Sequence, residues 1–187
     1  MNKKKFEVRR RYDATAKHYD TRYTNIQKQK YREVFSNINL LNYNLILDVG
    51  AGTGLLLDFC KEKVQEIICC DLSFNMLMEG KKKHHNGFFI CSDIESLPFR
   101  KNSFDLCTSF SVLQNISDID KLIAEKYLVL KEGGNLIITA LGKKFDKNIL
   151  KHTIDKTGFK LANIWNLSIE DISLIASKGE RRTLVSR

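Results

Sequence analysis

The chain has 187 residues, of which 43% are hydrophobic, so it can bury one substantial core but has no room for a second catalytic domain. Its formal net charge is +9, and no apolar run approaches the roughly 20 residues of a membrane-spanning helix. No secretory segment follows the first five residues, and the five cysteines lack C-x-x-C spacing, so we expect a soluble, cytoplasmic protein with buried free thiols and no metal site.

The first 42 residues predict a helical leader ahead of a domain that spans residues 43–187. Tyr12 and Tyr19 are seven residues apart, or two helical turns, so both rings can face the same side. They either line a cavity or anchor a surface helix. Tyr19 and His18 are the candidate catalytic residues of this segment, and a histidine that is merely solvated is the alternative for His18.

A glycine-rich turn is the strongest motif. The apolar strand that ends at Asp48 and Val49 leads into Gly50-Ala51-Gly52-Thr53-Gly54 and then into an apolar helix start. Such a turn lets the backbone approach a ligand where no Cβ would fit. Its third glycine comes one residue earlier than in the dinucleotide fingerprint, which disfavours NAD or FAD. Asp48 either orients the turn and approaches the ligand or merely ends a buried strand.

Two further apolar runs end in acidic residues. Residues 67–70 lead to Asp71 and Leu72, and Ser73 is placed to cap a helix that starts at residue 74. A carboxylate at this strand end can accept hydrogen bonds from both hydroxyls of a ribose, although it can also be a simple helix-start charge. A third strand over 88–91 leads to Asp93 and Ile94.

Strand-like runs and helical periods alternate through the rest of the chain, which predicts a parallel sheet covered on both faces. A fourth strand falls within 103–113, and a helix-to-strand turn with the fifth strand within 129–139. A helix over 146–157 and strands over 159–167 and 172–176 follow.

In this order the motifs resemble those of class I S-adenosylmethionine (SAM)-dependent methyltransferases, in particular the small "type 11" domain. The resemblance implies a three-layer, doubly wound α/β fold. Its seven-stranded sheet is mostly parallel with an antiparallel last strand, and the methyltransferase domain covers 43–187. Glu132 stands where the family usually has proline, a change on which no step of the chemistry depends.

The resemblance also implies the cofactor SAM, the product S-adenosylhomocysteine, and a role for each motif. The ribose binds Asp71, the adenine amino group binds Asp93, and a ring nitrogen meets the backbone N–H of Ile94. Residues 11–20 resemble a "YD-x-x-A-x-x-YD" leader that folds over the cofactor as a lid. The cofactor-binding residues implied in this way are Tyr12, Tyr19, Asp48, Gly50, Ala51, Gly52, Gly54, Asp71, Leu72, Asp93, Ile94, Ser109 and Phe110.

The acceptor is less constrained, because the sulfonium already activates the methyl group and a base is needed only for a protonated acceptor. Ser109-Phe110-Ser111-Val112 replaces the Asn/Asp-Pro-Pro-Tyr/Phe motif of the adenine- and amide-modifying branch, which disfavours that branch. We expect a small-molecule acceptor. The basic runs 9–11, 81–83 and 143–144 keep an RNA or protein acceptor open, with an activating subunit or a homodimer. A non-catalytic interaction subunit is the third reading, which the intact glycines and acids disfavour.

Overall fold

The computed structural model describes residues 3–179; residues 1–2 and 180–187, the outer ends of the two predicted segments, lie outside the described residues. The strands are β1 (Leu45–Val49), β2 (Glu66–Asp71), β3 (Phe88–Cys91), β4 (Phe104–Phe110), β5 (Leu130–Leu141), β6 (Phe159–Asn166) and β7 (Asp171–Lys178). The helices are α1 (Lys3–Phe35), α2 (Leu55–Cys60), α3 (Phe74–Lys83), α4 (Ile119–Val129) and α5 (Lys147–Lys156), with short 3₁₀ turns η1 (Leu40–Asn42) and η2 (Leu113–Asn115).

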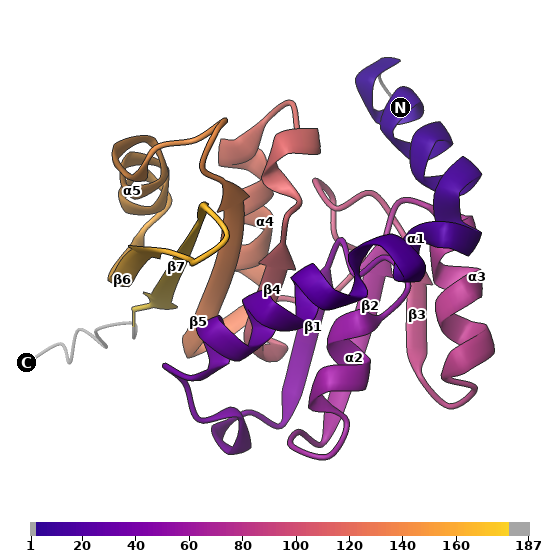
Figure 1. Ribbon diagram of the computed structural model, residues 1–187. Coiled ribbons are helices and arrows are strands. Elements are labelled where there is room, and N and C mark those ends of the chain that lie inside the picture. Colours follow the sequence, from indigo (N-terminus) through magenta and orange to yellow (C-terminus); the bar gives the residue numbers. More distant parts are fainter. Residues whose placement is uncertain (1–2, 180–187) are drawn as a thin grey trace, which may run out of the picture.

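The seven strands form one sheet in the order β3-β2-β1-β4-β5-β7-β6. Neighbours from β3 to β5 are parallel, and β7 is antiparallel to both β5 and β6. Figure 1 shows the helices packed around this sheet, with α5, β6 and β7 at the end farthest from α3. The predicted three-layer α/β fold with its antiparallel closing strand is therefore confirmed.

Two separate hydrophobic clusters cover the two faces of the sheet. On one face, α4 and α5 contribute residues such as Leu122 and Ile154. On the other, α1 and α2 contribute residues such as Val34 and Leu56. Strands buried on both sides in this way need apolar residues along their whole length, which explains the runs in the sequence.

Side-chain caps fix the starts of several helices. Ser73 accepts a hydrogen bond from the Met76 N–H and begins α3, as its position predicted. Asp146 does the same for α5, and Gly158, at φ +87°, follows the end of that helix. The sequence predicted a turn before the fifth strand, but residues 131–134 belong to β5 itself. The pairing of β5 with β4 is irregular there, between Leu130 and Asn135.

The topology determines where a ligand can bind. The strand order reverses between β1 and β4, and open α/β sheets bind ligands outside the carboxyl ends of their strands at such a reversal. Helix α1, the long indigo helix of Figure 1, runs across the molecule beside α2 and α3. Its first half borders this strand edge, so residues far upstream of the glycine turn take part in the site.

Two expectations from composition can be compared directly with the described residues. All five cysteines are free; four are buried and Cys91 is exposed. Between residues 3 and 179, no helix has the length and apolar character needed to cross a membrane.

Candidate functional site

A cavity of about 70 Å³ lies between the carboxyl ends of β1, β2 and β4 and the first half of α1. It collects residues from five separate parts of the chain, which is how a parallel sheet assembles a site. The predicted cofactor-binding residues that line it are Tyr12, Tyr19, Gly50, Gly52, Asp71, Leu72, Asp93, Ile94 and Phe110.

The glycine turn has a backbone conformation that other residues rarely adopt. Gly50, Gly52 and Gly54 have φ values of +80°, +58° and +77°. A Cβ on Gly50 would lie 2.3 Å from Cγ2 of Val112, so this position also needs glycine for space. The backbone N–H groups of Gly50 and Ala51 both donate to the Cys70 carbonyl, at 2.8 and 3.1 Å, which ties the turn to β2.

Asp71 ends β2 and joins the turn to the next helix. Its Oδ2 accepts from the Gly52 N–H at 2.9 Å, and its Oδ1 accepts from the Ser73 N–H at 2.8 Å. Desolvation raises the pKa of Asp71, although hydrogen bonds from the Ser73, Gly52 and Leu72 backbone oppose the shift. Each carboxylate oxygen retains further acceptor capacity, so this side chain can still receive two hydroxyl groups.

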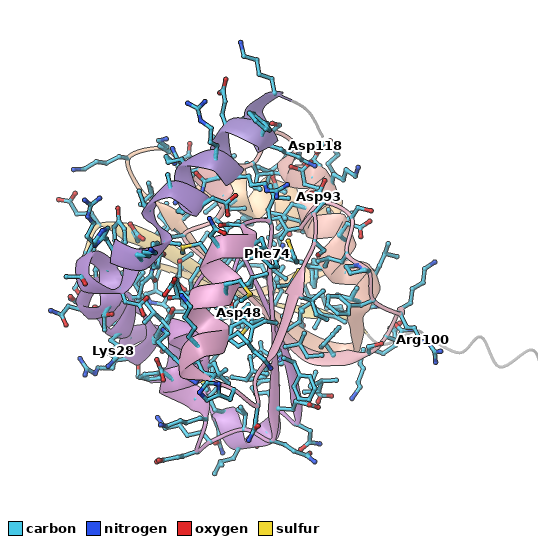
Figure 2. The ribbon with its side chains drawn as sticks, turned by 90° about the vertical axis from the view of Figure 1, so that its right-hand side faces the viewer. Lys28, Asp48, Phe74, Asp93, Arg100 and Asp118 are labelled. Carbon is cyan, nitrogen blue, oxygen red and sulfur yellow. The ribbon has the colours of Figure 1, made fainter. Side chains whose placement is uncertain are left out.

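Asp93 follows β3 and is bound by a residue of α1. Lys5 Nζ lies 2.7 Å from Asp93 Oδ2 and 3.0 Å from Glu95 Oε2. Burial acts to raise the pKa of Asp93, but the hydrogen bond and charge of Lys5 and the Glu95 N–H outweigh it and hold that pKa below its usual value. Figure 2 shows Asp93 near the N-terminal half of α1, whereas Lys28 lies at the far end of the same helix.

Further polar contacts hold the first half of α1 over the cavity. Asp13 Oδ1 accepts from Ser73 Oγ at 2.6 Å and from the Asn75 N–H at 3.1 Å. Asp20 Oδ1 accepts a hydrogen bond from Thr53 Oγ1, inside the glycine turn. These contacts link α1 to the segments that follow β1 and β2.

Tyr12 and Tyr19 face the same cavity, and their ring centroids are 6.4 Å apart. Burial, followed by the proximity of Tyr12, raises the pKa of Tyr19 well above its ordinary value. The Tyr19 phenol is therefore neutral near pH 7 and can hydrogen-bond or pack but not act as a base. His18, the other candidate catalytic residue, lies outside the cavity lining: one residue turns a helix by about 100°, and this places His18 on the exposed side of α1.

Four other predicted residues lie behind the cavity wall. Asp48 is buried within the molecule (Figure 2), where Oδ1 accepts from Thr108 Oγ1 at 2.8 Å, and burial raises its pKa to about 7. Ser109 Oγ donates to the Val49 carbonyl at 3.1 Å. Neither Ala51 nor Gly54 lines the cavity. The contacts of Asp48 and Ser109 bind β1 to β4.

Several lining residues were missed by sequence reasoning. They come from α1 and from the segments after β3 and β4, with Met76 of α3. Lys5, Val8, Tyr12 and Tyr19 are spaced at i, i+3, i+7 and i+14, so the helical period that drew attention to the tyrosines also includes the first two. The missed lining residues are Lys5, Val8, Met76, Glu95, Ser111, Val112, Asn115 and Ile116.

Comparison with known proteins relates the chain to a protein family. Residues 47–138 match the model of a family described as "Methyltransferase domain". A demethylmenaquinone methyltransferase from Renibacterium salmoninarum is 31% identical over 142 residues, which cover 74% of this chain and 60% of the relative. The matched part of the first curated relatives spans from 37% to 62% of their own length.

Solved structures share the fold at low sequence identity. A chain of the complex between the Haloferax volcanii Trm112 methyltransferase activator and a methyltransferase has a TM-score of 0.75 at 13% identity, covering 90% of this chain and 98% of that one. Haemonchus contortus phosphoethanolamine N-methyltransferase 2, solved in complex with SAM, has a TM-score of 0.66 at 20% identity, covering 73% and 49%.

Proposed function

Because this chain belongs, through residues 47–138, to the methyltransferase domain family, we propose that it transfers the methyl group of SAM to a small-molecule acceptor. One observation carries the proposal. Gly50, Gly52, Asp71 and Asp93 line a single cavity, as a nucleoside-binding site requires. They come from the ends of three different strands, so the coincidence is a property of the fold and not of one local motif.

The side chains present fit the proposed cofactor. Asp71, fixed by two backbone N–H groups, would accept both ribose hydroxyls, and Asp93 with the Ile94 N–H would bind adenine. Gly50 and Gly52 line the cavity at the end of β1, where the lack of a side chain would let the methionine portion approach the backbone. When bound, SAM supplies an already activated methyl group, so the protein has to hold the acceptor in line and exclude water.

The cavity in this arrangement is too small for that cofactor. It measures about 70 Å³, whereas sites for molecules of drug size have about 300 Å³ or more. We propose that residues 3–20 of α1 act as a lid that moves outward and then closes over the ligand. The second half of α1 keeps its place because Tyr31 and Val34 are buried in the core.

A small acceptor is favoured over RNA because part of the basic surface is neutralised within the molecule. Arg9 pairs with Asp13 at 3.4 Å, and Lys83 pairs with Asp20 at 2.6 Å. The cavity wall also contains tyrosine, valine, isoleucine and phenylalanine side chains, which suit a mostly apolar molecule. The Renibacterium relative, by its name, methylates such a compound, demethylmenaquinone.

The proposal is tested by incubating the purified protein with methyl-labelled SAM and an extract of its own organism. We expect the label in small, extractable molecules. Label in a nuclease- or protease-sensitive polymer would replace the acceptor by RNA or protein. Calorimetric SAM binding without any labelled product would indicate a required partner subunit. No binding at millimolar SAM would leave a non-catalytic interaction role.

A further inference from the structure

A second group of buried polar side chains lies beside the cofactor residues, over the other half of the sheet. The cofactor residues follow β1, β2 and β3, whereas these side chains come from the second half of α1, from the residue after β4 and from the start of β7. We call Lys30, Ser111 and Asp171 the acceptor-side cluster. Ser111 lines the cavity between Phe110 and Val112, so the cluster reaches the same space from the opposite side.

The cluster contains a buried ion pair that contacts a hydroxyl group. Lys30 Nζ lies 2.6 Å from Asp171 Oδ2, and both side chains are at least nine-tenths buried. The same ammonium group donates to Ser111 Oγ at 2.5 Å. Burying two charges is costly, and a well-packed apolar pair would often be as stable, so their presence at a cavity wall suggests a role beyond folding.

Ser111 is also held in an unusual backbone conformation. Its φ is +58°, a region that non-glycine residues seldom adopt. Its N–H donates to Thr139 Oγ1 at 3.0 Å and to the Thr139 carbonyl at 3.2 Å, while its own carbonyl accepts from Gln114 Nε2. Strain of this kind persists where surrounding contacts over-determine it, and it gathers at functional sites.

Unpartnered polar atoms surround this serine. Ser173 pairs with Thr139 across β5 and β7, is fully buried, and its Oγ has no hydrogen-bond partner among the described residues. Gln114 Oε1 is likewise unpartnered there. Buried polar atoms are nearly always hydrogen-bonded, so the residues around Ser111 are not arranged for the hydrogen bonding of a folded core alone.

We propose that Ser111 positions the methyl acceptor by donating a hydrogen bond to an oxygen of that molecule, such as a carbonyl or phenolic oxygen. A hydroxyl that accepts from Lys30 keeps its hydrogen to donate, and no hydrogen bond donated by Ser111 Oγ is found within residues 3–179. Lys30 and Asp171 are positioning residues, because they orient the hydroxyl without touching the acceptor. This inference rests on the proposed function and specifies which half of the site binds the acceptor.

The decisive variant is Ser111→Gly, because it removes the hydroxyl and relieves the backbone strain together. The probe is the methanol-soluble fraction of the extract, titrated at saturating methyl-labelled SAM. We expect SAM affinity within twofold of the wild type, an unfolding midpoint no lower, and at least a tenfold rise in the half-saturating extract dose or a tenfold fall in rate. Transfer by Ser111→Gly within twofold of the wild type would overturn the inference.

The ion pair is tested with Lys30→Met/Asp171→Leu, which removes both charges and leaves neither partner buried alone. We expect a higher half-saturating dose with SAM affinity unchanged, which a merely structural role would not produce. Lys131→Met/Asp105→Leu is the control for a pair away from the cavity, since these residues, 2.6 Å apart, lie at the amino ends of β5 and β4. Equal doses for the two double variants would overturn the positioning role. If the wild type labels nothing small, the proposed function fails before this inference is reached.

Discussion

Replacing Lys5 with methionine tests whether the first half of α1 must open before SAM binds. The Lys5 side chain is 13% exposed and pairs with Asp93 and Glu95, at 2.7 and 3.0 Å. If Asp93 binds adenine, this contact stabilises the closed arrangement against the cofactor. A ligand that needs a minor open state binds more weakly by the fraction of molecules in that state.

The size of the effect follows from the geometry of the pair. Hydrogen bonds to charged groups contribute about 1.5–3 kcal/mol, which we reduce to about 1–2 kcal/mol because Asp93 is partly exposed to solvent. At about 1.4 kcal/mol per tenfold, Lys5→Met should therefore bind SAM roughly 5–30 times more tightly than the wild type.

The assay is calorimetric titration with SAM at fixed pH and salt. Lys131→Met serves as the control, because it removes a lysine paired at 2.6 Å with Asp105, far from the cavity, and should leave the affinity unchanged. An affinity of Lys5→Met equal to or weaker than that of the wild type would refute the reasoning and show that Lys5 need not leave Asp93.

Gly50→Ala should destabilise the fold by about 2–5 kcal/mol, from the left-handed φ and a Cβ only 2.3 Å from Val112, whereas Gly133→Ala, at φ +76° in open space, should lose only about 1–2. Equal urea midpoints for the two would contradict the clash. Asp71→Ala should weaken SAM binding by about 1.5–3 kcal/mol, and an unchanged calorimetric affinity would remove Asp71 from the site. Burial raises the pKa of Asp48 to about 7, so its contribution to stability is full below about pH 4 and is lost as pH rises through 7. Asp48→Asn should therefore show a smaller fall in unfolding free energy between pH 5 and pH 8, by about 1–3 kcal/mol, and a pH profile identical to the wild type would exclude this effect.

Local patterns explain why the glycine turn and Asp71 come together. Gly50, Gly52 and Asp71 lie within one strand-turn-helix unit and the end of the next strand, so their meeting follows from parallel pairing of β1 with β2. His18, by contrast, lies on the exposed side of α1 and outside the cavity lining. Its neighbour Tyr19 faces the cavity, and adjacent helix residues point in different directions.

The core of the molecule also shows a limit to what local sequence patterns can predict about burial. In α4, Leu122, Ile123 and Val129 are buried on the face that packs against the sheet. Lys126 is also fully buried, at a position that no polarity pattern would assign to a core. Burial lowers the pKa of this lysine to about 8. A polarity pattern indicates which face of a helix is apolar on average, whereas packing against the sheet determines whether each single residue is buried.

The sequence by itself determined the strands, the glycine turn and the acids at the strand ends, because each depends on residues within a few positions of one another. Only the tertiary structure decided that Lys5 pairs with Asp93 and that Lys30 meets Ser111 and Asp171. Those partners are separated by 81 residues or more, and their contact depends on the path of α1 across the sheet. That path is set by burial of Tyr31 and Val34 in the core, a property of the whole packed molecule that no single segment contains.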